Sequence, residues 1–412
     1  MFKFSKEILY RNRRIIENFS YLSILQIFNL ILPLITYPYL IRVLGKESFG
    51  GIVFAQAIIS YLAIIVGYGF NISATKNISI NKNNKKIISE IVSSVLIIKA
   101  VLFLISLIIL YILLKIFNSF ELNQSLFYFT MYLCLNELIF PVWYFQGLEK
   151  MKFTTLFNLV SRLIFVGLIF IFIKSEKDYL LVPIINGVGI IIAGLFSLYV
   201  IFFVHGVRFK WQKKSMLLYY IKDSTSLFIS NAMVMVKEKS NIVLIGSILS
   251  MSEVSYYDLI LKIASILRTP FMALRDAIFP NIAKSQNKSK YLKITLGATL
   301  ISFLAYGLLI VFKTPIILFL GGPDMINSVS LVPLMGLIIP FGVLSMFMGS
   351  ALILFFDSRR YTLSIVYSMI YFITGLSVLY LFNAFNLKYL IILLVTSILI
   401  EIISRTYLYI KK

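Results

Sequence analysis

Apolar runs of about 20 residues, separated by short polar connections, recur along the whole chain. A helix needs roughly 20 consecutive apolar residues to cross a hydrocarbon layer about 30 Å thick. The pattern predicts twelve spans, at residues 18–41, 49–70, 87–115, 125–146, 153–173, 179–203, 224–249, 256–279, 291–313, 328–356, 361–383 and 388–410. The connections are too short for a soluble domain, so we predict an all-α, multi-pass membrane protein.

A shift of the sequence by 205 residues, close to half its length, aligns the predicted spans of the two halves in order. The segment "KESFGGIVFA" then falls on "MSEVSYYDLI", and two Asn/Lys-rich connections coincide. Six spans per half give both halves the same orientation, which is typical of transporters built from parallel repeats. We therefore predict two six-helix lobes, residues 1–210 and 211–412, around a central cavity.

Composition agrees with a membrane protein, because 60% of residues are hydrophobic and 14% are charged, against about 25% charged in soluble domains. The net charge of +22 follows from loop asymmetry. Of the 39 Lys and Arg, 25 lie on the side of the termini and 7 on the opposite side. The positive-inside rule then predicts both termini in the cytoplasm. Because this accounts for most of the charge, we expect no nucleic-acid partner.

The other seven basic residues lie within predicted spans, where a charge at the bilayer centre costs about 2.5–3.5 kcal/mol. Three ionisable residues, Lys237, Glu238 and Lys239, are adjacent at the middle of one span. Lys262 and Arg275 lie nearer span ends, where snorkelling to the interface is an equal alternative. We predict that this set binds an anionic cargo: Lys99, Arg162, Lys237, Lys239, Lys262, Arg268 and Arg275.

The predicted helix at 256–279 has one polar face. At 100° per residue, an arc of about 140° collects Asp258, Lys262, Ser265, Arg268, Thr269, Arg275 and Asp276. The opposite face is apolar and holds Leu259, Ile260, Ile263, Leu267, Phe271, Leu274 and Ile278. We expect the polar arc to face a wet or protein-lined interior.

Acidic residues inside the spans offer a second role. Glu137, Glu238 and Asp258 could neutralise nearby bases, or they could bind H⁺ or Na⁺ and couple its flow to transport. Interhelical ion pairs are the competing interpretation of the buried charges. Because bases outnumber these acids, we expect surplus positive charge. We predict no cofactor and no resident metal, and the single histidine, His205, has no partner evident in the sequence.

Three segments carry a family resemblance: "PVWYFQGLEKMKF" (141–153), "LIRVLGKESFGGIVFAQ" (40–56) and "LFLGGPDMINSVSLVPLMGL" (318–337). Together with the twelve spans, the chain resembles bacterial Wzx-type flippases of polysaccharide repeat units, which share a superfamily with multidrug and toxin extruders. The resemblance implies a MATE-like fold in the bacterial cytoplasmic (inner) membrane. It implies export of an undecaprenyl-diphosphate-linked oligosaccharide, with possible association with a glycan polymerase and a chain-length regulator.

The first segment is the most specific, and five of its residues mark a predicted motif and candidate gate: Pro141, Trp143, Gln146, Gly147 and Glu149. Pro141 should interrupt a helix near its end. Aromatic residues such as Trp143 suit the headgroup belt, and Gly147 would allow the chain to reverse. A purely structural turn is the alternative to a gate.

Two other functions fit a protein of this size. A multidrug or cation antiporter shares the fold, but it would favour acidic residues in its cavity, and bases dominate here. An intramembrane glycan polymerase or transferase usually carries its chemistry on a long outer loop, and no such loop or Asp-x-Asp metal pair is found in the sequence. We therefore expect a transporter without catalytic residues.

Overall fold

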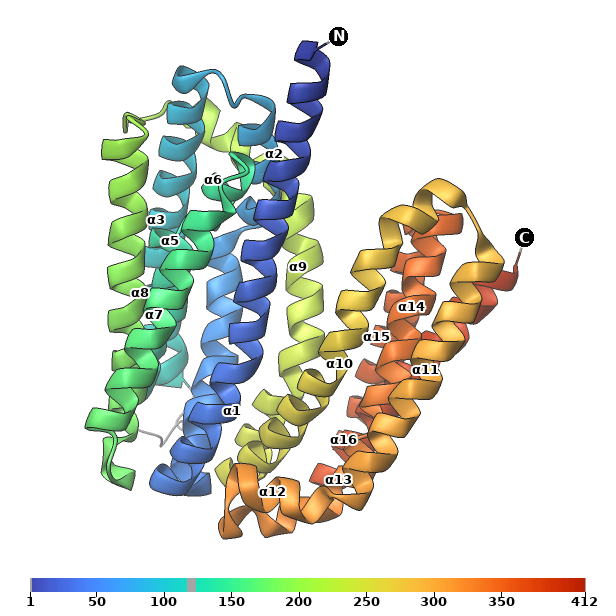
Figure 1. Ribbon diagram of the computed structural model, residues 1–412. Coiled ribbons are helices and arrows are strands. Elements are labelled where there is room, and N and C mark those ends of the chain that lie inside the picture. Colours follow the sequence, from blue (N-terminus) through green and yellow to red (C-terminus); the bar gives the residue numbers. More distant parts are fainter. Residues whose placement is uncertain (1, 117–123, 412) are drawn as a thin grey trace. The chain divides into compact units, whose positions relative to one another are not determined.

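The computed structural model describes residues 2–116 and 124–411, and all regular elements within them are helices (Figure 1). The predicted connection at 116–124 lies almost wholly outside these residues. The chain divides into two compact units, Met1–Val243 and Leu244–Lys412, called unit 1 and unit 2 below. The helix α9 continues across the division, and the predicted lobe boundary at residue 210 stays a prediction.

Unit 1 is a bundle of long helices that are interrupted at several points. Its elements are α1 (Phe2–Gly67), α2 (Phe70–Ile80), α3 (Lys85–Ile116), α4 (Gln124–Thr130), α5 (Tyr132–Ile139), α6 (Val142–Gly147), α7 (Met151–Phe172), η1 (Glu176–Leu180), α8 (Leu181–Tyr199), η2 (Val200–Val204) and most of α9 (Lys214–Ile248). Residue Gly45 within α1 has a non-helical φ of 74°, which separates the first two predicted spans.

The second interruption lies between α1 and α2. Tyr68 and Gly69 both have positive φ, 43° and 75°, and a Cβ atom at Gly69 would lie 2.9 Å from the backbone nitrogen of Phe228 on α9. Glycine is therefore needed here for its backbone conformation and for the close approach of α9. The predicted span at 49–70 stops at this break, but helical structure resumes immediately after it.

The motif segment joins α5, α6 and α7. Pro141 lies between α5 and α6 and ends the helix, as predicted. Two details of the prediction were wrong. Trp143 is only 1% exposed and packs in the core of unit 1 instead of the headgroup belt. The chain reverses at Glu149, with φ 58°, while Gly147 is helical and serves close packing against α2.

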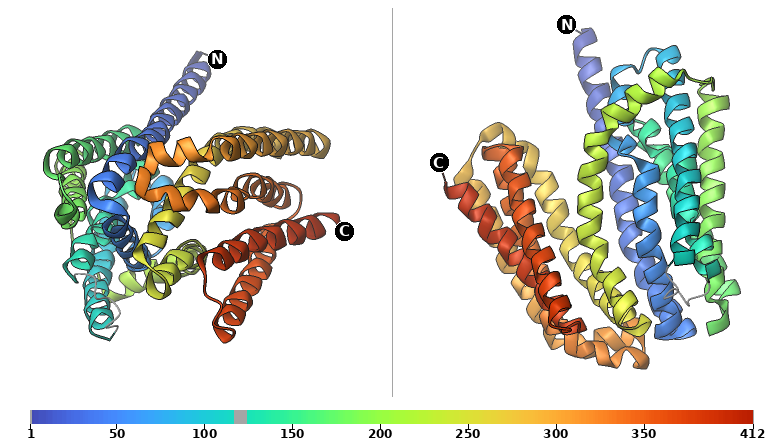
Figure 2. Two further views of the ribbon diagram at one scale, coloured as in Figure 1. Left: turned by 90° about the horizontal axis from the view of Figure 1, so that it is seen from below. Right: turned by 180° about the vertical axis from the view of Figure 1, so that it is seen from behind.

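Unit 2 contains α10 (Met251–Ser285), α11 (Lys288–Val311), α12 (Lys313–Gly321), η3 (Pro323–Leu331), α13 (Val332–Met335), α14 (Ile338–Phe355), α15 (Ser358–Leu381) and α16 (Leu387–Ile410). Within it α14 lies between α11 and α16, and α15 packs on α16 (Figure 2). Four helices begin at side-chain caps that accept backbone N–H bonds, which fixes their starts: Ser250, Asn287, Asp357 and Asn386.

The element starts follow the predicted 205-residue repeat. A shift of 205 carries the start of α3 to residue 290, and α11 begins at Lys288. The start of α7 is carried to 356 and that of α8 to 386, where α15 and α16 begin at Ser358 and Leu387. The repeat is not exact, because α10 runs unbroken where unit 1 has the break at Tyr68–Gly69, and α14 runs unbroken where unit 1 has the break at Pro141.

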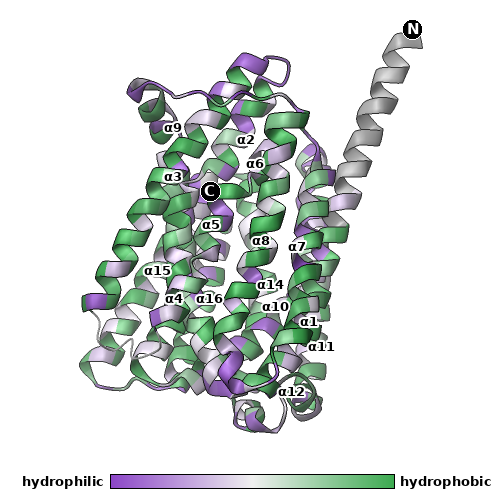
Figure 3. Cartoon of the chain, turned by 90° about the vertical axis from the view of Figure 1, so that its left-hand side faces the viewer, coloured by the Kyte–Doolittle hydropathy of each residue, from purple (hydrophilic) through white to green (hydrophobic). Residues whose placement is uncertain are grey.

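The described residues contain nine segments that are long and apolar enough to cross a membrane, and Ile24–Ile80 is one that holds two predicted spans. These segments account for ten of the twelve predicted spans. Helices α9 and α10 cover the other two, with more polar residues. Apolar residues dominate the middle of the unit 1 helices, and polar residues gather at their ends (Figure 3). The predicted multi-pass membrane architecture is confirmed.

The contact between α6 and α2 gives a first prediction. A Cβ atom at Gly147 would lie 2.8 Å from Cβ of Ile78 and 2.9 Å from the backbone oxygen of Thr75. We expect Gly147→Ala to destabilise unit 1 by about 1–3 kcal/mol, since overpacking forces the two helices apart. The control is Gly167→Ala on α7, whose Cβ would meet nothing within 4 Å. Melting of the detergent-purified protein measures both, and equal melting temperatures would contradict this account.

Candidate functional site

Unit 1 contains a cavity of about 200 Å³ at the break between α1 and α2. Its polar lining comes from α1, α2, α5 and α9: Ser60, Asn71, Asn136, Glu137 and Asn231. Gly67 and Gly69, on either side of the break, also line it. Non-helical backbone at membrane depth is tolerated where it is buried in protein or lines a cavity. In transporters, such discontinuous helices commonly form ion and substrate sites.

The cavity carboxylate belongs to Glu137, and it is paired with a buried base. Lys99 on α3 is 1% exposed. Its Nζ donates to the backbone oxygen of Glu137 at 2.8 Å and lies 3.3 Å from Oε2 of the same residue. The Glu137 side chain is 26% exposed. One oxygen atom therefore neutralises a buried ammonium, while the carboxylate still borders the cavity.

Local sequence fixes this arrangement. Pro141 ends α5 just after Glu137, and residue 67 opposite it is a glycine. A Cβ atom at Gly67 would lie 3.0 Å from Oε2 of Glu137, so the carboxylate occupies the space that a larger side chain would fill. Lys99 is thus matched by an acid and is not a surplus cation, and its assignment to the cargo-binding set stays a prediction.

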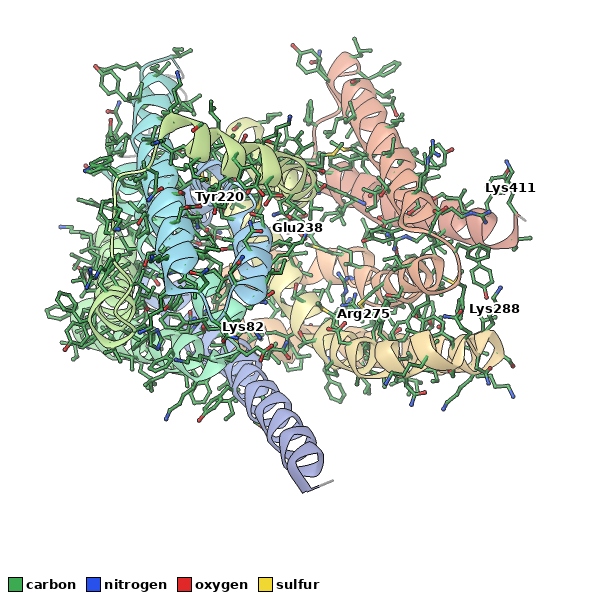
Figure 4. The ribbon with its side chains drawn as sticks, turned by 90° about the horizontal axis from the view of Figure 1, so that it is seen from above. Lys82, Tyr220, Glu238, Arg275, Lys288 and Lys411 are labelled. Atoms are coloured by element: carbon green, nitrogen blue, oxygen red, sulfur yellow. The ribbon has the colours of Figure 1, made fainter. Side chains whose placement is uncertain are left out.

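Two predicted unit 1 cations differ from Lys99. Within the part of the chain that the structure describes, no carboxylate lies within ion-pair distance of Arg162 on α7 or of Lys239 on α9. Both side chains are half-buried, as is Lys237. Glu238 between the two lysines is exposed, which agrees with successive helical residues pointing in different directions. Figure 4 labels Glu238 on α9.

Unit 2 holds Arg268 on α10 against α14. A Cβ atom at Gly342 would lie 2.8 Å from Cζ and 2.9 Å from Nε of Arg268. The guanidinium therefore rests directly on the backbone of α14, in a space that only glycine leaves open. Its side chain is half-buried. The small residue on α14 and the base on α10 together hold a positive group within the unit.

The predicted two-faced character of α10 is largely present. On the apolar face Leu259, Ile260 and Ile263 are buried, although Leu274 is 40% exposed. On the polar face Ser265 and Asp276 are exposed, and Asp258, Lys262 and Thr269 are half-buried. Arg275 pairs with its neighbour Asp276, with Nη2 2.6 Å from Oδ1 (Figure 4 labels Arg275). Arg275 is therefore matched by a carboxylate, and its side chain is not a surplus cation.

A further buried base was missed. We counted Arg405 among the terminal basic residues, but it is 3% exposed on α16. Its Nη2 lies 2.5 Å from Oε1 of Glu401, its Nη1 donates to Oγ of Ser345 at 2.8 Å, and its Nε donates to Oγ of Ser364 at 3.2 Å. The i,i+4 spacing of Glu401 and Arg405 was the available sequence signal. With these partners the network binds α14, α15 and α16 together.

The motif residues sit at one end of unit 1 and make structural contacts. Glu149 pairs with Lys82, with Nζ 2.5 Å from Oε1 (Figure 4 labels Lys82). His205 does have partners, contrary to expectation: its Nδ1 lies 3.0 Å from the Tyr144 hydroxyl and its Nε2 2.9 Å from Nζ of Lys150. Gln146 is exposed. These contacts favour a structural turn, and a gate stays a prediction.

The protonation state of His205 follows from these contacts. An ammonium has only donors, so Nε2 must accept from Lys150 and Nδ1 must carry the proton. Burial, together with the positive charges of Lys150 and Lys85, lowers the pKa of His205 to about 4. The imidazole is therefore neutral at pH 7 and joins the α6–α7 turn to the segment after η2.

Comparison with known sequences identifies the family. Residues 15–286, which are more than half of the chain, match the family described as "Polysaccharide biosynthesis protein". The chain belongs to this family. Two proteins named "Putative O-antigen transporter" are similar to it: one from Escherichia coli (strain K12), 30% identical over 274 residues, and one from Shigella dysenteriae, 27% identical over 259 residues.

These similarities cover 65% and 62% of this chain. They cover 65% and 64% of the two relatives, so the chain spans slightly less than two thirds of the relatives' length. The family membership expected from the sequence motifs is thereby confirmed.

Solved structures of other proteins share the fold of this chain. An inward-facing multidrug resistance MATE family transporter of the MOP superfamily superposes with a TM-score of 0.73 at 13% identity, covering 95% of this chain and 96% of that one. The lipid II flippase MurJ, in an inward closed conformation, gives 0.72 at 14% identity over 93% and 86%. The predicted MATE-like fold is confirmed, and identities this low concern the fold alone.

The buried pair generates a second prediction. Removal of one member of a buried ion pair costs about 3–5 kcal/mol, because a charge remains uncompensated. We expect Glu137→Gln to lower stability more than Lys99→Met. The first change leaves the enclosed Lys99 ammonium without a counter-charge, whereas the second leaves a carboxylate that still borders the cavity. The double variant should lose less than the sum of both. Thermal melting in detergent measures this cycle, with the exposed Lys177→Met as the control; additive losses would show that the pair is not coupled.

His205 generates a third prediction. Its folded-state pKa of about 4 lies below the ordinary value of 6.5, so the stability it contributes is present above pH 6.5 and is lost as pH falls through about 4. We expect the melting temperature of the native chain to drop across this window more steeply than that of His205→Gln. If the melting temperatures of the two proteins fall by the same amount between pH 7 and pH 4, the proposed neutral imidazole is ruled out.

Proposed function

We propose that this protein is a flippase that moves an undecaprenyl-diphosphate-linked oligosaccharide from the cytoplasmic to the outer leaflet of the bacterial inner membrane by alternating access. The observation that carries the proposal is membership of the polysaccharide biosynthesis family, together with relatives named for O-antigen transport. The MATE-type fold supports a transporter. On this proposal the protein is not an enzyme and has no catalytic residue.

The diphosphate of the cargo is the part that the buried bases would recognise. Charge-assisted hydrogen bonds to phosphate are about twice as strong as neutral ones and gain further strength away from water. Arg162 and Lys239 lack carboxylate partners among the described residues. Arg268 is held on Gly342. These three residues are the proposed principal contacts, and Lys237 and Lys262 remain further candidates.

Ion coupling is proposed at the unit 1 cavity. Glu137 is the carboxylate of the cavity lining, and four amide or hydroxyl side chains around it could complete a small-cation site. Lys99 already neutralises Glu137, so an entering H⁺ or Na⁺ would compete with the Lys99 ammonium for one carboxylate. That competition couples ion binding to a movement between α3 and α5. Glu238 and Asp258 stay as alternative coupling residues.

The main alternative is a multidrug or cation antiporter, which the same fold would serve. A cationic drug would be attracted by an uncompensated acid, whereas Glu137 is paired with Lys99. The family relationship and the half-buried bases both favour an anionic, glycan-bearing cargo. A polymerase or transferase has no supporting observation here. A cytoplasmic location of both termini, and association with a polymerase and chain-length regulator, remain part of the proposal.

A reconstituted assay tests the function. The protein is placed in liposomes carrying an undecaprenyl-diphosphate-linked oligosaccharide, and a lectin that does not cross the membrane reports the outward-facing glycan over time. We expect the native chain to accelerate exposure. The variant Lys239→Gln/Arg268→Gln should be at least about tenfold slower, since each lost charged hydrogen bond is worth about 1.5–3 kcal/mol.

The matched control removes two exposed lysines, one from each unit, as Lys177→Gln/Lys388→Gln, and it should flip at the native rate. Lys239→Arg should retain more activity than Lys239→Gln if the ammonium acts mainly as a point charge. A native chain that leaves the glycan inside but exports cationic dyes would replace the flippase proposal with the antiporter.

A further inference from the structure

The segment that joins η2 to α9, residues 206–214, ends at the first residue of α9 and is rich in basic and aromatic residues. It reads "GVRFKWQKK" and contains four basic residues, two aromatic residues and no acid. Phe209 is 47% exposed and Trp211 is 83% exposed, and their rings meet edge to face at 6.0 Å. Large apolar side chains this exposed and adjacent to cations match the composition of membrane interfaces.

The segment is fixed along α3. The side chain of Val207 is buried in the core of unit 1. The backbone N–H of Arg208 donates to Oγ of Ser89 at 3.1 Å, and that of Lys210 donates to Oγ of Ser93 at 3.0 Å. Two serines one helical turn apart therefore hold the segment against the start of α3, which leaves its aromatic and basic side chains outward.

The position along α3 corresponds to the headgroup layer. Helix α3 has 32 residues, or about 48 Å at 1.5 Å per residue, which exceeds a hydrocarbon layer of about 30 Å. The first turns hold Lys85, Lys86 and Glu90, so we place the excess length at this end, in the headgroups. Ser89 and Ser93 lie four and eight residues after Lys85, so the bound segment descends about 6 to 12 Å from the helix start.

The segment also lies on the lipid-facing side of α3. Leu104 and Ile108 are 60% and 59% exposed, and at 100° per residue Ser93 is about 20° and about 60° from them around the helix. Ser93 is nevertheless fully buried, because residues 208–210 cover it. The segment thus occupies the place that lipid takes further along the same face.

We propose that residues 206–214 bind anionic phospholipids, with Phe209 and Trp211 at the acyl boundary and the basic side chains on the phosphodiester headgroups. The partner is the bulk lipid of the adjoining leaflet, not the transported cargo. Four cations in a segment that itself contains no acid give the charge complementarity, because juxtamembrane Lys and Arg attract anionic headgroups at short range. The site would anchor the connection that leads into α9.

Tryptophan fluorescence tests this directly, since the chain has two Trp. Trp143 is buried, and its indole N–H has no hydrogen-bond partner among the described residues. Trp143→Phe should therefore fold and leave Trp211 as the reporter. The full chain is placed in nanodiscs of phosphatidylglycerol and phosphatidylcholine at 1:1, with bromine on the acyl chains of one lipid or the other. If Trp143→Phe does not fold, the fluorescence of the Trp211→Phe variant is subtracted from that of the native chain, and the difference is the fluorescence of Trp211.

We expect brominated phosphatidylglycerol to quench Trp211 at least about twofold more than brominated phosphatidylcholine. Arg208→Gln/Lys210→Gln/Lys213→Gln should reduce this ratio to about one. The matched control, Lys288→Gln/Lys290→Gln/Lys293→Gln, removes three exposed lysines of α11 and should leave the ratio unchanged. Equal quenching by both lipids in the native segment, or quenching by neither because the ring lies in water or on a protein, would overturn the proposal.

Discussion

The pairing of Lys99 with Glu137 is the interaction on which the interior of unit 1 depends. An ammonium that is 1% exposed at the middle of a membrane helix is tolerated only with a partner of opposite charge. The backbone carbonyl and the carboxylate of Glu137 supply that partner, so the contact fixes the position of α3 along α5. The same contact leaves the Glu137 carboxylate at the cavity. The residue that neutralises Lys99 is therefore also available to bind an ion.

The break at Tyr68–Gly69 and the carboxylate depend on each other. Interruption of a membrane helix frees backbone groups that lipid could not satisfy, so the surroundings must be polar. Here the surroundings are a cavity lined by asparagines and Glu137. Gly67 lets the carboxylate approach the broken helix, and the approach of α9 at Gly69 closes the other side. A larger side chain at Gly67 or Gly69 would move Glu137 or α9 away from the break, and the backbone groups freed there would lose their polar surroundings.

Hydropathy predicted the helices well because each span must bury its own backbone; the last predicted span, 388–410, differs by one residue from Leu387–Ile410. Contacts between distant residues were harder to predict. Trp143 was assigned to the headgroup belt from its chemistry, but the helices around it bury it. Arg405 was counted with the terminal charges because it lies near the end of the chain, and its contact with Ser345, 60 residues away, could not be read from the sequence. Of the candidate site, the charged positions were predictable, while their pairing depended on which helices meet.

The repeat relates one acid of unit 1 to a glycine of unit 2, and one base of unit 2 to an alanine of unit 1. The 205-residue shift places Glu137 on Gly342 and Ala63 on Arg268. In unit 1 the acid stands on α5 and faces small residues of α1, since Ala63 and Gly67 line its cavity. In unit 2 the base stands on α10 and rests on the glycine of α14. At these facing positions each unit has room for one large side chain. In unit 1 α5 carries it, as Glu137, and in unit 2 α10 carries it, as Arg268. A duplicated scaffold can thereby place a carboxylate at one of these facing positions in unit 1 and a guanidinium at the other in unit 2, without any change in helix order.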